Sequence, residues 1–87
     1  MKIEFYTGFI KNYNKRFGKN KKIKIRFIER TKLFQNDHRN PLLKNHPLKG
    51  KKLNQRAFSV TGDIRVIYQI VNGTIYFVDI GTHNQVY

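Results

Sequence analysis

The stretch TGDIRVIYQIVNGTIYFVDIGTHNQVY, residues 61–87, decides the fold of this chain. Asn72-Gly73 lies between two runs of alternating apolar residues and favours a tight hairpin turn, because both residues tolerate a positive φ. Both faces of the two predicted strands carry apolar side chains, so we expect the hairpin to be central in its sheet rather than at a solvated edge. Gly81 is expected to end the second strand and to release a polar tail that contains His83 and Tyr87.

The N-terminal third predicts one strand and two helices. Residues 2–6 alternate as a strand, and Thr7 is the expected cap of the helix that follows. Apolar residues then recur at helical spacing as far as the stop at Gly18. Residues 21–37 alternate locally like a strand, but their length without a turn signal favours a second helix.

The middle of the chain predicts a loop and a further strand. Residues 36–50 are punctuated by Pro41 and Pro47, and proline disfavours helix at the preceding residue. Residues 53–60 alternate as a strand that leads into the hairpin. The predicted fold is therefore α+β in the order β-α-α-β-β-β, with an N-terminal helical hairpin packed on one antiparallel sheet.

Charge narrows the class of partner. The 87 residues include 18 Lys and Arg against 5 acidic residues, a net charge of +13. Such a field attracts polyanions, so the sequence predicts a nucleic acid or an acidic protein as partner; the alternative is a basic surface that is only solvated. The length predicts a single domain, residues 1–87, with one modest core. Without a membrane-length apolar run or a signal peptide, we expect a cytoplasmic protein that makes no membrane contact.

The polar residues favour phosphodiester chemistry without a metal or other cofactor. The sequence has no cysteine and no glycine-rich phosphate-binding motif, and its histidines lack acidic neighbours at metal-ligand spacing. RNA carries its own nucleophile, the 2′-hydroxyl, so an enzyme needs only a base, an acid and a cation for the phosphate charge. Histidine suits acid or base work because its unperturbed pKa is about 6.5. We therefore select His83 as one member of the acid–base pair and His46 or Asp63 as the other.

The remaining candidates would bind the RNA. Arg65 would stabilise the phosphate charge, and Tyr87 would stack on a base or orient a phosphate. Each residue also has a structural interpretation: surface histidines are commonly inert, aspartate is common in turns, and Arg65 could pair with Asp63 or Asp79. Tyr87 could simply close the core. The further candidates for RNA binding are Lys49, Lys51 and Lys52.

The second half of the chain resembles the RelE/ParE superfamily of bacterial toxin–antitoxin modules, in particular its YafQ-like members. The helical pair matches only in length and pattern. The resemblance implies a curved antiparallel sheet with two N-terminal helices. The segments that carry the resemblance are Asn40-Pro41-Leu42, His46-Pro47-Leu48-Lys49-Gly50, Arg56-Ala57-Phe58-Ser59-Val60, Gly62-Asp63-Ile64-Arg65-Val66-Ile67-Tyr68 and Gly81-Thr82-His83-Asn84.

For function, the resemblance implies a ribosome-dependent endoribonuclease that cuts messenger RNA in the decoding site. It also implies a cognate antitoxin that holds the enzyme inactive. The residues that the family implicates in catalysis fall on His46, Asp63 and His83. The family's C-terminal aromatic residue falls on Tyr87, and the arginine that holds the scissile phosphate in many relatives falls on Arg65.

Two departures and two alternatives go with this resemblance. Ser59 stands where YafQ-like enzymes carry a further histidine, and Ile64 stands where they carry an aromatic residue. The same superfamily contains ParE-type toxins, which inhibit DNA gyrase and lack the nuclease residues; His46 and His83 together argue against that branch. The other alternative is a catalytically inactive, basic RNA-binding module.

Overall fold

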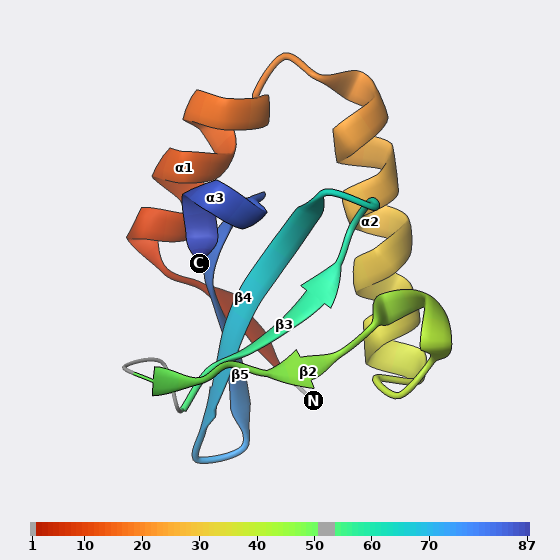
Figure 1. Ribbon diagram of the computed structural model, residues 1–87, viewed down its shortest axis with the longest axis vertical. Coiled ribbons are helices and arrows are strands. Elements are labelled where there is room, and N and C mark those ends of the chain that lie inside the picture. The colour runs from red at the N-terminus through yellow and green to blue at the C-terminus, as the bar shows by residue number, and fades with distance from the viewer. Residues whose placement is uncertain (1, 51–53) are drawn as a thin grey trace.

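The computed structural model describes residues 2–50 and 54–87 of the chain. It has the predicted α+β class, with two long helices before the main hairpin and a five-stranded sheet (Figure 1). Within the described ranges, no helix has the length and apolarity needed to cross a membrane. Along the chain, the elements are β1 (Ile3–Phe5), α1 (Thr7–Phe17), α2 (Lys21–Asn36), the 3₁₀ turn η1 (Pro41–Leu43), β2 (His46–Pro47), β3 (Arg56–Ser59), β4 (Ile64–Val71), β5 (Thr74–Thr82) and α3 (His83–Val86).

The hairpin of β4 and β5 forms the centre of the sheet, as predicted. The strand order is β1-β5-β4-β3-β2, so each hairpin strand has a neighbour on both sides. Asn72 and Gly73 connect the two strands with φ values of 50° and 81°, the positive angles that a tight hairpin turn requires. The pairing extends from Val71 opposite Thr74 to Ile64 opposite Thr82.

The second helix is also confirmed. α2 runs from Lys21 to Asn36, and the Asn20 side chain caps it by accepting a hydrogen bond from the Ile23 amide at 3.1 Å. The predicted cap of the first helix is wrong, because Tyr6 occupies the N-cap position and Thr7 is already helical. Length without a turn signal therefore identified the helix correctly, whereas cap chemistry alone misplaced the start of α1.

Aromatic side chains join the helices to the sheet. Phe34 of α2 stacks on Phe58 of β3 with ring centroids 4.7 Å apart. Phe9 of α1 and Phe27 of α2 lie 5.8 Å apart between centroids, so the two helices meet through their aromatic side chains. Phe9, Phe34 and Phe58 belong to one buried core cluster. Burying each such ring contributes about 1.5–3 kcal/mol, which fits stability that comes from packing alone.

Three predictions about the sheet are corrected. β1 pairs with β5 in parallel, with Ile3 opposite Ile75, so the sheet is mixed rather than antiparallel throughout. β2 is a two-residue edge strand inside the predicted loop, where Pro47 is tolerated because an edge position needs no second ladder bond. β3 begins at Arg56, later than the predicted start at residue 53, which lies outside the described residues.

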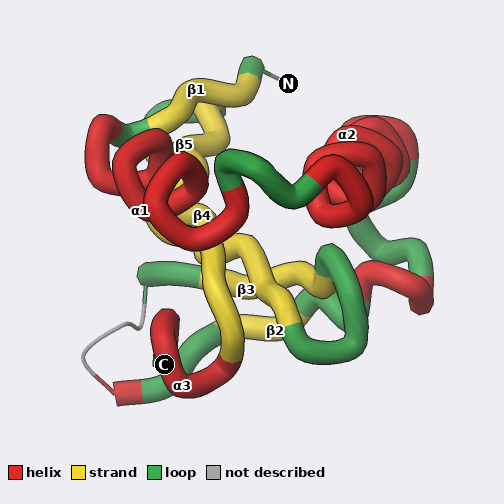
Figure 2. Tube along the Cα trace, turned by 90° about the horizontal axis from the view of Figure 1, so that it is seen from above, coloured by secondary structure: helices red, strands yellow, loops and turns green. Residues whose placement is uncertain are grey.

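The tail is a short helix rather than an extended release from the sheet. β5 continues through Gly81, which pairs with Arg65, and ends at Thr82. α3 then begins at His83. The prediction that Gly81 ends the strand is therefore wrong. In Figure 2, α3 and α2 lie on opposite sides of β3 and β4.

Candidate active site

Strand alternation places the candidate residues on the sheet face turned away from the aromatic core. His46 pairs with Ala57, and Ala57 pairs with Ile67. Ala57 and Ile67 are buried in a second apolar cluster with Leu48 and Val86. The core residue Phe58, one position along β3, points to the other face. His46 and the residues of α3 therefore share one side of the sheet.

α3 is held in place at both ends. Thr82 and Gln85 form a capping box, in which Gln85 Oε1 accepts a hydrogen bond from the Thr82 amide at 2.8 Å. Val86 is 2% exposed and packs on the second apolar cluster. A helix of four residues is too short to be stable alone, so this tertiary packing is what makes it form. The packing presents His83 and Tyr87, one turn apart, above the sheet.

Tyr87 and His46 meet directly. The Tyr87 hydroxyl lies 3.2 Å from His46 Nε2, and His46 Nδ1 lies 2.9 Å from the carbonyl oxygen of Lys44. A carbonyl oxygen only accepts, so Nδ1 carries the hydrogen and donates it. In the neutral ring, Nε2 is then an acceptor, and the Tyr87 hydroxyl donates to it. The predicted convergence of the loop around His46 with the C-terminal tail is confirmed.

His83 completes an open recess around this contact. Its ring lies edge-on to the Tyr87 ring, with centroids 4.5 Å apart and an angle of 86°. The recess has a volume of about 370 Å³, and Lys49 contributes to its wall. The recess therefore combines two imidazoles, a phenol and an ammonium group. Its described lining residues are His46, Pro47, Leu48, Lys49, His83 and Tyr87.

Arg65 adds a fixed positive charge beside Tyr87. One amino group of its guanidinium, Nη1, donates to the carbonyl oxygens of Thr61 at 3.3 Å and Gly62 at 3.2 Å. Partial burial raises the pKa of Tyr87 above its usual value, although the charge of Arg65 and a hydrogen bond with it act in the opposite direction. Tyr87 is therefore a neutral phenol at neutral pH. Asp79 pairs with Arg16 at 3.1 Å, so it is not the partner of Arg65.

Asp63 is outside this recess. It is exposed in the turn between β3 and β4, where its amide donates to Thr61 Oγ1 at 3.2 Å. Its carboxylate makes no hydrogen bond or ion pair with another described residue. The geometry thus brings together His46, His83, Tyr87, Arg65 and Lys49, but not Asp63. The predicted RNA-binding residues Lys51 and Lys52 lie outside the described residues.

Two features of the site had no clear signal in the sequence. The Lys44 carbonyl fixes the His46 ring, and a backbone contact of this kind depends on loop geometry that residue types do not encode. Ser59, opposite Arg65 on β3, is 4% exposed, and its hydroxyl has no hydrogen-bond partner in the described part of the chain. In that same part, no three or more His, Cys, Asp or Glu residues converge as a metal site.

Comparisons with solved structures agree with this fold. The chain is similar to a mutant of YafQ from Escherichia coli, with 22% identity, a TM-score of 0.81, and 98% of this chain and 96% of that chain covered. It is similar to the E. coli DinJ–YafQ complex, with 23% identity, a TM-score of 0.79 and the same coverage of 98% and 96%. A metal-bound toxin from Helicobacter pylori matches with 25% identity and a TM-score of 0.78, covering 100% of this chain and 99% of that chain.

The sequence comparisons identify the family. No curated protein sequence matches the chain significantly. The family model described as "Bacterial toxin of type II toxin-antitoxin system, YafQ" matches residues 1–87. Because that match extends over the whole chain, the protein belongs to the YafQ family of bacterial toxins from type II toxin–antitoxin systems.

Proposed function

We propose that this toxin is a ribosome-dependent, metal-independent endoribonuclease that cleaves translated messenger RNA and acts in the cytoplasm, where the ribosomes are. The observation that carries the proposal is the hydrogen bond between Tyr87 and His46 Nε2 beside His83. It places an imidazole with a defined acceptor nitrogen and a second imidazole in one recess. Two such groups are what cleavage by the RNA 2′-hydroxyl requires.

His46 is the favoured base. Its Nδ1 hydrogen is held by the Lys44 carbonyl, so Nε2 keeps a lone pair directed toward Tyr87 and the recess. When RNA binds, the 2′-hydroxyl replaces the Tyr87 hydroxyl as the donor to Nε2. Nε2 then takes the proton of the 2′-hydroxyl as the 2′-oxygen forms a bond to phosphorus. Asp63 is the alternative base, but its carboxylate does not line the recess. General base catalysis of this kind typically contributes a factor of roughly 10²–10⁴.

His83 acts as the acid and Arg65 as the cation. As the bond from phosphorus to the 5′-oxygen breaks, His83 donates a proton to that oxygen. The products are a 2′,3′-cyclic phosphate and a free 5′-hydroxyl. Arg65, held by the carbonyls of Thr61 and Gly62, supplies fixed charge to the phosphate oxygens without reorganising during the reaction. Lys49 at the wall of the recess adds charge.

A cognate antitoxin is the second proposed partner. The described complex of E. coli YafQ with DinJ supports such a pairing. A groove of about 260 Å³ between α1 and α2 is almost wholly apolar and includes Ile10, which is 48% exposed, and Ile28, which is 43% exposed. Exposed apolar surface of this kind marks an interaction site. Lys24 at its wall and the net charge of +13 suit an antitoxin helix with an apolar face and acidic flanks.

The direct test adds purified toxin to translating ribosomes and maps the new 5′ ends on the messenger RNA. The proposal predicts cleavage that requires ribosomes and persists when a chelator selective for transition metals is added at a concentration that leaves the magnesium of the ribosomes in place. Cleavage of naked RNA at the same rate would contradict ribosome dependence. Absence of cleavage together with arrest of DNA gyrase would replace the nuclease with the gyrase-inhibiting alternative.

A further inference from the structure

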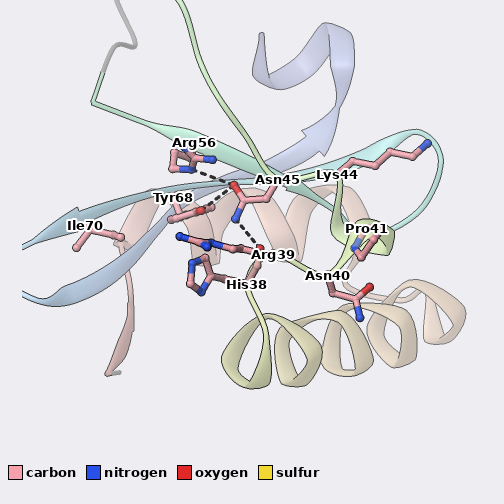
Figure 3. Close-up of a pocket in the computed structure, with 9 residues that line it drawn as sticks. All are labelled: His38, Arg39, Asn40, Pro41, Lys44, Asn45, Arg56, Tyr68 and Ile70. Carbon is pink, nitrogen blue, oxygen red and sulfur yellow. Dashed lines mark hydrogen bonds between the residues drawn. The ribbon is translucent and has the colours of Figure 1, made fainter.

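We call the recess lined by His46 and His83 the histidine recess. A second pocket lies on the opposite face of the β2–β3 edge from it (Figure 3). Arg56 and Ala57 are consecutive in β3, so their side chains point to opposite faces, and Ala57 is on the face of His46. The pocket that Arg56 lines has a volume of about 510 Å³. Its polar wall comes from His38, Arg39, Asn45, Arg56 and Tyr68, and we name it the Arg56 pocket.

Asn45 organises the Arg56 pocket. Its Oδ1 accepts hydrogen bonds from Arg56 Nε at 3.0 Å and from the Tyr68 hydroxyl at 2.9 Å. Its Nδ2 donates to the carbonyl oxygen of His38 at 3.1 Å. The loop is thereby fastened to β3 and β4, and the Arg56 guanidinium is held in one orientation. Neither Nη group of Arg56 has a partner among the described residues, so both remain available to a ligand.

The charge in the Arg56 pocket is positive and unbalanced. Of the described residues, no acidic one lines it. Asp37 precedes the lining residue His38 in the sequence, but its Oδ1 accepts a hydrogen bond from the Arg39 backbone amide at 3.1 Å. Within the described chain, the Arg39 guanidinium makes no hydrogen bond or ion pair, and Figure 3 shows it directed toward Tyr68. Guanidinium groups bind planar pairs of oxyanion oxygens, so the pocket suits a phosphate or a carboxylate.

Two features favour the phosphate of RNA over an acidic peptide. Lys44 and Asn45 line the Arg56 pocket, whereas the next two residues, His46 and Pro47, line the histidine recess. Adjacent Cα atoms are about 3.8 Å apart. An RNA strand held at the histidine recess therefore needs only to pass over the edge strand β2 to place a neighbouring phosphate in the Arg56 pocket. A recess of about 90 Å³ shares His38 and Ile70 with the Arg56 pocket, and the exposed His38 ring offers a surface on which a base can stack.

We propose that the Arg56 pocket binds a phosphate group of single-stranded RNA, next to the nucleotide that is held at the histidine recess. Arg39 and Arg56 clasp the phosphate oxygens, and Asn45 keeps Arg56 aligned for that contact. The inference rests on the proposed nuclease function, since the same RNA strand occupies both pockets. It adds a binding subsite that sets the register of the strand across β2.

The test measures how the isolated toxin binds a 2′-O-methyl oligoribonucleotide, which it cannot cleave because the nucleophile is blocked. Fluorescence anisotropy over a salt series gives the dissociation constant. Arg39→Gln is expected to weaken binding about five- to tenfold and to reduce the slope of log K against log salt by roughly 0.7, the loss of one phosphate contact. Arg56→Lys keeps the charge but loses bidentate geometry, and it is expected to weaken binding as well.

Lys22→Gln is the matched control. It also removes one positive charge, but Lys22 is exposed near the N-terminal end of α2, whereas the Arg56 pocket begins at His38, beyond the C-terminal end of that helix. We expect it to weaken binding by no more than about twofold, because a distant surface charge contributes little at moderate salt. Equal losses in Arg39→Gln and Lys22→Gln would show that the pocket contributes only general electrostatic attraction and would overturn the proposal.

The same variants separate this proposal from the proposed function. If wild-type toxin binds the oligonucleotide through Arg39 but cuts no RNA on ribosomes, the nuclease proposal fails and the phosphate subsite remains supported. If Arg39→Gln leaves oligonucleotide binding unchanged and weakens the antitoxin complex instead, the pocket holds an acidic peptide and the proposal is overturned.

Discussion

Tyr87 and His46 lie 41 residues apart in the sequence, and their side chains meet at 3.2 Å between the phenol oxygen and Nε2. The contact joins the C-terminal helix to the edge strand β2. It also identifies Nε2 as the acceptor nitrogen of His46, because Nδ1 donates to the Lys44 carbonyl. In our account, this contact orients His46 for catalysis, while the capping box and the burial of Val86 hold α3 in place.

Replacing Tyr87 by Phe removes the hydroxyl and retains the ring that contacts His83. We expect cleavage on ribosomes to fall roughly three- to tenfold, the effect of one neutral hydrogen bond that orients His46. Tyr87→Ala should cost more, because the edge-on contact with His83 is lost as well. Single-turnover cleavage rates at saturating toxin would measure both. Equal rates in wild type and Tyr87→Phe would remove the hydroxyl from the mechanism.

Gly81 couples α3 to α1. A Cβ added there would lie 2.6 Å from Gln85 Oε1 and 2.8 Å from Arg16 Nη1, so the capping box must shift. We expect Gly81→Ala to lower the free energy of unfolding by about 1–2 kcal/mol and to lower activity by displacing α3. Gly8→Ala is the control, since nothing lies within 4 Å of its added Cβ and alanine favours the helix. A larger free energy of unfolding in denaturant for Gly81→Ala than for Gly8→Ala would contradict this account of α3.

Ile28→Asp should weaken the antitoxin complex at least about tenfold. The substitution places a charge in the apolar groove between α1 and α2, where a docked helix would desolvate it. Ile25→Asp on the same helix is the control, because Ile25 is 58% exposed and does not line that groove. Titration of labelled toxin with antitoxin gives the dissociation constant of the complex for each variant. Matching losses in the two variants would place the antitoxin elsewhere.

Burial makes part of the stability sensitive to alkaline pH. It raises the pKa of Tyr87, and it raises the pKa of Tyr13 in the same way. Above pH of about 10, where a free tyrosine ionises, the folded chain therefore holds more protons than the unfolded chain. The stability linked to these residues is complete below that pH and falls as pH rises through their folded pKa values. In unfolding curves from pH 9 to 11, Tyr87→Phe should flatten the decline; an unchanged slope would contradict the assignment to Tyr87.

The main hairpin and the helices could be predicted because their signals are local. Asn72-Gly73 tolerates positive φ in any context, and the length of residues 21–37 favours a helix whatever lies nearby. β2 and α3 could not be predicted in this way. β2 has two residues and α3 has four, which is too few for a local strand or helix pattern. Both form because of tertiary contacts; for α3, the contact is the burial of Val86. The parallel direction of β1 likewise depends on its partner β5, which no local pattern encodes.

Part of the candidate site could also be predicted from the sequence. His46, His83, Arg65 and Tyr87 were selectable by residue type and resemblance, and the structure places them together. Asp63 matched by the same criteria, yet it is exposed in the turn between β3 and β4 and does not line the recess. Arg39 and Arg56 looked like ordinary basic residues. Their pocket depends on the side chain of Asn45, which bonds to three separate segments.

The measurement that tests the central claim most directly compares His46→Gln, His83→Gln and Asp63→Asn in single-turnover cleavage of messenger RNA on translating ribosomes. Our account predicts losses of roughly 10²–10⁴ for each histidine variant with folding unchanged, and a clearly smaller loss for Asp63→Asn. Wild-type cleavage in His46→Gln and His83→Gln would contradict the account, and a loss in Asp63→Asn equal to that in His46→Gln would move the base to Asp63.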